Sequence, residues 1–99
     1  MFQPDRSARA DVRNPVLLLP ATKRLLALPP DVRLAIADVL KDLYRDAKAR
    51  AERSWRSKKG PMAVYWRCVA VYALRLGRAL RPRRHELRRA RVADLPAAA

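Results

Sequence analysis

The chain has 99 residues, which suits a single domain, and 51% of them are hydrophobic, although 18 are alanine. Lys and Arg number 23 against nine Asp and Glu, so the net charge is +14, which favours a polyanionic partner. The single cysteine excludes an internal disulfide framework, and no uncharged apolar run approaches the ~20 residues that a membrane-spanning helix needs.

The N-terminal third is predicted to hold little regular structure. Residues 1–14 carry charges of both signs without periodicity, which predicts a flexible arm, and they lack the apolar core of a signal peptide. Residues 15–92 are predicted to form one helical domain. Its first segment, PVLLLP, is expected to lie extended on the core, and residues 20–28 form a short helix that Pro29 and Pro30 end.

A long helix is predicted over residues 30–59. Asp31 complements the positive end of its dipole, while Gly60 is placed to be the residue just after the helix, with Pro61 following. An apolar stripe recurs at helical spacing and is expected to face the core. Its members are Val32, Ile36, Val39, Leu40, Leu43 and Ala47.

A second helix over residues 62–81 is predicted to fold back along the first, since a short link favours antiparallel neighbours. It is apolar on nearly every side, which is typical of a buried central helix, and Cys68 is therefore expected to be a buried thiol. One of its stripes is interpreted as core, or alternatively as a dimer seam or a partner contact. That stripe consists of Tyr65, Trp66, Val69, Tyr72 and Leu76.

Residues 83–92 favour a short basic helix, and residues 93–99 are predicted to be a flexible tail. The expected fold is thus all-α: a small helical domain built on a long antiparallel hairpin of residues 30–59 and 62–81, with a short leading helix and a short basic C-terminal helix.

The positive charge is concentrated in the second half of the chain. Residues 1–47 have a net charge of +2, whereas residues 48–99 have a net charge of +12. Two stretches, residues 48–59 and 78–91, hold most of it and are predicted to bind phosphates. The candidate nucleic-acid-binding residues are Lys48, Arg50, Arg53, Trp55, Arg56, Lys58, Lys59, Arg78, Arg81, Arg83, Arg84, Arg88 and Arg89.

Two alternatives to this interpretation stay open. Trp55 is suited to stacking on a base, but it is also suited to packing on Tyr65 or Trp66 across the hairpin. The excess of 18 Arg over five Lys is in addition typical of a GC-rich genome, in which case the basic surface is merely solvated.

Catalysis and metal binding find little support in the residue types. Asp38, Asp42 and Asp46 lie on one helix face, where they could hold a metal ion. Cations three or four residues further along the same helix instead predict ordinary ion pairs, and Arg75 or Arg78 across the hairpin are further candidate partners. The single histidine, the absence of a Gly-rich phosphate loop and the absence of Cys/His spacing predict no enzyme, cofactor or metal site.

The predicted function is that of a small, non-enzymatic, cytoplasmic protein that binds DNA or RNA mainly through the phosphate backbone. The alternative is a helical interaction module that docks an acidic protein partner or self-associates as a homo-oligomer. A third alternative is peripheral binding to anionic lipid.

Overall fold

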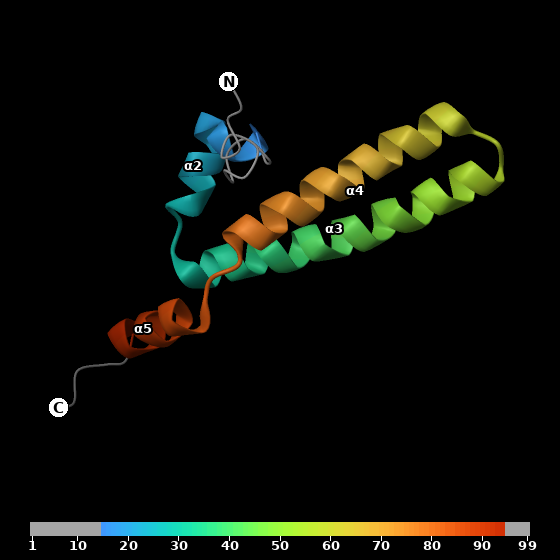
Figure 1. Cartoon of the computed structure of the whole chain (residues 1–99). Helices are drawn as coiled ribbons and strands as arrows, with labels where there is room; N and C mark the ends of the chain where they lie inside the picture. The colour runs from blue at the N-terminus through green and yellow to red at the C-terminus, as the bar shows by residue number, and fades with distance from the viewer. Residues whose placement is uncertain (1–14, 95–99) are drawn as a thin grey trace, which may run out of the picture.

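Two long antiparallel helices form the body of the protein (Figure 1). The structure is a computed structural model that describes residues 15–94, with side chains described as far as residue 92. Helix α3 (Pro30–Arg56) and helix α4 (Gly60–Leu80) lie side by side along their length. The predicted all-α hairpin is confirmed, and residues 15–94 contain no strand.

The turn between α3 and α4 differs in detail from the prediction. Helix α3 ends at Arg56, three residues early, and Lys58 rather than Gly60 adopts the left-handed conformation, with φ of 59°. The Lys58 amide donates to the Trp55 carbonyl at 3.0 Å, and the Lys59 amide donates to the Ser54 carbonyl at 2.8 Å. This pair of bonds is a Schellman motif, which satisfies carbonyls that the helix end leaves without partners. Gly60 instead begins α4.

Replacing Lys58 with glycine should stabilise the hairpin. A side chain in the left-handed region costs roughly 1–2 kcal/mol, which glycine avoids, although glycine also loses more backbone entropy on folding. We expect K58G to raise the free energy of unfolding by about 0.5–1 kcal/mol, measured by urea denaturation. The control K59G changes a neighbour with φ of −102°, and it should give no gain.

Three short elements flank the hairpin at the end away from the turn. The segment PVLLLP was expected to be extended, but it contains a 3-10 helix, η1 (Pro15–Leu18). Helix α2 (Pro20–Leu26) follows directly, and the buried Thr22 hydroxyl donates to the Val16 carbonyl at 2.7 Å, tying the two together. Both pack on α4.

Helix α5 (Arg84–Asp94) packs on α3 and runs two residues past its predicted end. An ion pair between Arg33 and Glu86 joins the two helices. The hydrogen bond from Arg33, with the positive charges of Arg33, His85 and Arg83, lowers the pKa of the Glu86 carboxyl, so the pair is retained at neutral pH and lost only in acid. The predicted flexible arm, residues 1–14, and residues 95–99 of the predicted tail lie outside the described residues.

The seam between α3 and α4 is built from small side chains. Its fully or almost fully buried members are Ala37, Ala47 and Ala51 on α3 and Ala63, Ala70, Ala73 and Gly77 on α4. The helices approach so closely that a Cβ on Gly77 would lie 3.4 Å from the Leu40 Cβ and 3.6 Å from the Ala37 carbonyl oxygen. Small residues permit this approach, and larger ones would prevent it.

The predicted core stripe was therefore partly wrong. Ala47 is buried in the seam, and Ile36 and Leu40 are half-buried. Val32, Val39 and Leu43 are exposed, since they lie to one side of the alanines on the helix. The central helix is not buried on all sides either. Tyr65 and Tyr72 are exposed, as is Cys68, which was predicted to be a buried thiol.

The result is a flat, open molecule with a thin core. Its extents are 65 × 44 × 21 Å, and its radius of gyration is 17.9 Å, against about 13 Å for a compact chain of this length. Among residues 15–92, Leu80 is the one large apolar side chain that is fully buried.

Candidate nucleic-acid interface

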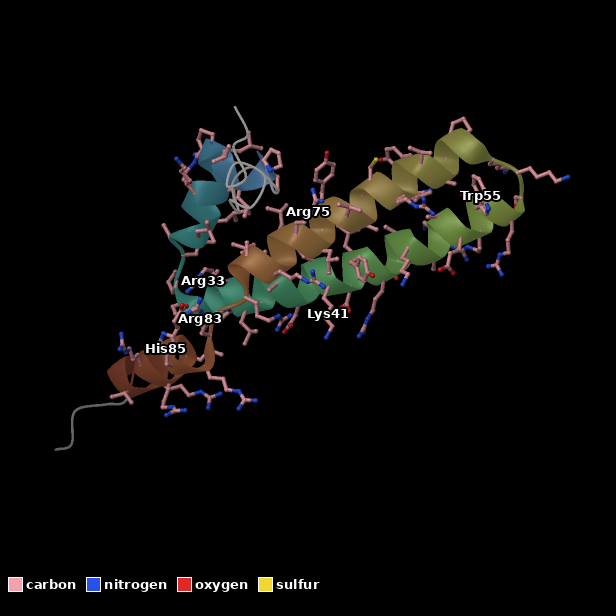
Figure 2. All side chains as sticks on the ribbon, viewed as in Figure 1. Arg33, Lys41, Trp55, Arg75, Arg83 and His85 are labelled. Atoms are coloured by element: carbon pink, nitrogen blue, oxygen red, sulfur yellow. The ribbon has the colours of Figure 1, made fainter. Side chains whose placement is uncertain are left out.

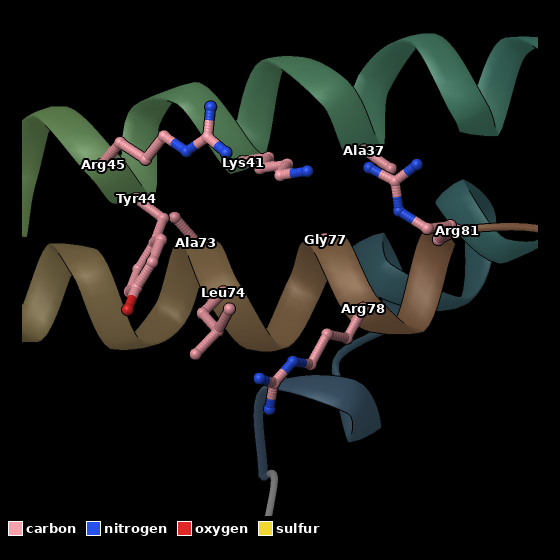
Figure 3. Close-up of a pocket in the computed structure, with 9 residues that line it drawn as sticks. All are labelled: Ala37, Lys41, Tyr44, Arg45, Ala73, Leu74, Gly77, Arg78 and Arg81. Carbon is pink, nitrogen blue, oxygen red and sulfur yellow. The ribbon is translucent and has the colours of Figure 1, made fainter.

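A shallow groove follows the junction of α3 and α4 on one face of the hairpin (Figure 3). One hollow, nearer the end of the hairpin where α4 ends, has a volume of about 320 Å³, and a second, nearer the turn, has a volume of about 260 Å³. Tyr44 lines both, so the two hollows are neighbours along the hairpin. We call the two together the basic groove. Its charged and aromatic side chains are Lys41, Tyr44, Arg45, Lys48, Glu52 and Trp55 from α3, Arg67 and Arg78 from α4, and Arg81 just after α4.

Helical spacing explains why these side chains share one face. On α3 they recur in steps of three, one, three, four and three residues from Lys41 to Trp55, which keeps them on one side of the helix. On α4, Arg67 and Arg78, with Arg81 just after the helix, likewise fall within a narrow arc. Because the helices run antiparallel across a narrow alanine seam, the two basic stripes lie on the same side of the hairpin.

The electrostatics of the basic groove are dominated by cations. Arg81 donates to the Asp38 carboxylate at 2.8 Å, which joins the end of α4 to α3 and leaves the guanidinium half-exposed. The Lys48 ammonium lies 5.8 Å from the centre of the Tyr44 ring, a cation–π geometry. Six cations thus border the basic groove, and Glu52 is the acidic residue among its lining side chains.

Trp55 lies near the turn of the hairpin (Figure 2), at the outer end of the basic groove. Its side chain is 69% exposed, which is unusual for so large an apolar residue. The alternative in which Trp55 packs on Tyr65 or Trp66 is not what the structure shows. Those two rings pair with each other edge to face, with centroids 5.0 Å apart.

The structure separates the thirteen predicted binding residues into three groups. Four of them lie in the basic groove: Lys48, Trp55, Arg78 and Arg81. Five others lie on the remaining surface of the turn end, namely Arg50, Arg53, Arg56, Lys58 and Lys59, all exposed. The last four, Arg83, Arg84, Arg88 and Arg89, lie exposed just before or on α5, at the opposite end of the hairpin.

Arg50 is turned away from the basic groove. Its guanidinium lies 5.3 Å from the centre of the Trp66 ring, which joins α3 to α4 on the other face of the hairpin. The linear run of residues 48–59 therefore does not act as one surface, because a helix distributes its members around the axis.

Four cationic or aromatic groove residues were absent from the prediction: Lys41, Tyr44, Arg45 and Arg67. They stand outside the two basic runs, so a search for local charge density passes over them. These residues can be identified only once the pairing of α3 with α4 is known. With the turn at residues 57–59, positions equally distant from it lie at the same level, which brings Lys41 and Arg45 opposite the segment that ends in Arg78.

The three aspartates of α3 show no metal-like arrangement. Within the described residues, no group of three His, Cys, Asp or Glu side chains comes together as a metal site. Pairing of an aspartate across the hairpin was predicted and is found at Asp38, but its partner is Arg81 and not Arg75 or Arg78.

None of the helices in residues 15–94 is long and apolar enough to cross a membrane. No family model matches the chain, and neither the curated proteins nor the solved structures include one with significant similarity to it.

Proposed function

We propose that the protein binds nucleic acid along the basic groove. The observation that carries this proposal is the combination of six cations with two aromatic side chains along two neighbouring hollows on one side of the hairpin. Cations neutralise phosphates and release counterions, while an aromatic ring stacks on a base. Neither feature alone is specific, but their alternation along a groove is typical of surfaces that follow a nucleic-acid strand.

Single strands are the expected substrate. The exposed ring of Trp55 at the end of the groove offers a stacking surface, and bases in a duplex are already stacked on each other. Lys41, Arg45 and Arg78 then contact the backbone of the same strand. Binding is expected not to depend on the sequence of the strand, since phosphate contacts carry no sequence information.

Fluorescence anisotropy with labelled single-stranded DNA, single-stranded RNA and duplex DNA tests the proposal at about 150 mM salt, where non-specific binding is weak, about 10⁻⁴–10⁻⁶ M. The groove variant R45Q/R78Q should lose roughly tenfold or more in affinity, and its salt dependence should be shallower by about two phosphate contacts. The matched variant R84Q/R88Q removes the same charge from α5 and should lose much less. Equal losses in both would show that the charge acts diffusely and that the groove is not the site.

The contribution of stacking is measured separately. W55A should weaken single-strand binding by about 5- to 150-fold, the equivalent of ~1–3 kcal/mol for one stacked base, while W55F should retain most of the affinity because the ring is kept. Tighter binding to polyglutamate than to any nucleic acid would instead favour an acidic protein as the partner and would contradict the proposal.

A further inference from the structure

Each long helix carries a second apolar stripe, on the face opposite the basic groove. On α3 it consists of Val32, Ile36, Val39 and Leu43, spaced by four, three and four residues. On α4 it consists of Tyr65, Val69, Tyr72 and Leu76, with the same spacing. We call these two stripes together the apolar face. Their members are exposed or half-buried, and Val39 is 67% exposed.

Both stripes lie on the same side of the hairpin. In each helix the apolar stripe is displaced from the alanine seam by roughly a quarter turn in the same rotational sense. Because the helices are antiparallel, this equal displacement brings the stripes to one side. The contact of Arg50 with the Trp66 ring, on that same side, agrees with this placement.

A helix with two adjacent heptad-spaced apolar stripes is typical of a four-helix bundle. One stripe packs on the neighbour in the hairpin, and the other packs on a second pair of helices. Here the first requirement is met by the alanine seam, and the second is left open within residues 15–92. A second hairpin would have to present an apolar face of the same width and spacing.

We propose that this second hairpin is another copy of the same chain, and that two copies pair through their apolar faces as a four-helix bundle. An isologous dimer uses the same patch twice, so a face that is apolar on both helices is its own complement. The dimer would also bury large side chains, whereas among residues 15–92 of the single chain Leu80 is the one large apolar side chain that is fully buried.

The area available fits such a dimer. The 21 residues of α4 give a length of roughly 30 Å, and two packed helices are roughly 20 Å wide, so the whole side of the hairpin that carries the apolar face has an area of about 600 Å² per copy and about 1,200 Å² in total. The two stripes cover part of this area, and the rest would form the polar rim of the interface. Specific interfaces begin near about 1,200 Å².

The charge distribution permits the pairing despite the net charge of +14. The cations of the basic groove lie on the opposite face, so they point away from the second copy. On α3, Asp46 and Arg50 lie between the end of the apolar stripe and the turn, and their opposite charges cancel. Pairing leaves both basic grooves exposed, and the dimer is therefore independent of the proposed nucleic-acid binding.

Sedimentation equilibrium from about 1 to 100 µM protein tests the dimer, with V39E as the variant and V64E as its control. Val39 and Val64 are both exposed helical valines, at 67% and 59%, but Val64 lies outside the apolar face. We expect the wild type and V64E to approach twice 11.3 kDa, and V39E to have a dimer dissociation constant at least about tenfold higher, because the interface would bury a carboxylate twice. A wild-type mass of one chain throughout, or equal weakening by both variants, would overturn the proposal.

Two further measurements need no variant. Because pairing stabilises only the folded chain, the wild-type Tm of a dimer rises with protein concentration, whereas the Tm of a monomer does not change. Salt should strengthen the dimer, since it screens repulsion between two positive chains, but it should weaken nucleic-acid binding. A Tm independent of concentration would overturn the dimer, and it would leave the groove variants R45Q/R78Q and W55A to decide the proposed function.

Discussion

Replacing Leu80 with alanine lowers the free energy of unfolding by about 2–5 kcal/mol, the range observed when a fully buried leucine is truncated. Leu80 is 0% exposed and is the last residue of α4, at the end of the hairpin where η1, α2 and α5 also lie. The described chain offers no second large side chain that is equally buried, so no neighbouring core compensates for the loss.

The control for L80A is L19A, the same truncation at a leucine that is 52% exposed. It should cost less than about 1 kcal/mol, because much of that side chain already contacts water. Urea denaturation at one fixed protein concentration measures both variants. Equal losses in L80A and L19A would contradict the assignment of Leu80 as the main apolar anchor.

Replacing Ala47 with leucine destabilises the protein by about 1–3 kcal/mol, although the substitution adds apolar surface and keeps a good helix former. Ala47 is 1% exposed within the seam, so the additional carbons have no space unless α3 and α4 separate. Separation would also weaken the contacts of the other seam alanines. The change therefore tests whether the hairpin depends on close approach.

Ala49 provides the matched control, because it lies two residues further along α3 and is exposed. A49L should change the free energy of unfolding by no more than about 0.5 kcal/mol, since a surface leucine has nearly the helix propensity of alanine. Thermal or urea denaturation compares the two. If A47L is as stable as A49L, the seam is loose and not closely packed.

The helices and their antiparallel order were predictable from local signals. Pro29 and Pro30 mark one boundary, and the turn at residues 57–59 leaves too little chain for any arrangement but a hairpin. The side of α3 that faces α4 was not predictable in the same way. The alanine stripe and the stripe beginning at Val32 both have helical spacing, and a ranking by side-chain size selects the wrong one.

The candidate site was only partly predictable for a related reason. Lys48 and Trp55 belong to a dense basic run, which local composition detects. Arg45 and Arg67 are separated by more than twenty residues, and only the pairing of the two helices brings them to one groove. The exposure of Cys68 has the same origin, because an apolar sequence does not reveal that too few helices are present to cover it.

The alanine seam also bears on how the two helices are kept in register. Small side chains present shallow ridges, so they resist sliding of one helix along the other less than interlocking leucines would. The alignment therefore depends on the two ends. The tight turn with its left-handed Lys58 sets it at one end, and the bond between Arg81 and Asp38 sets it at the other. A slip of one helical turn, ~5.4 Å, would move Arg78 away from Lys41 and break the alternation of cations along the groove.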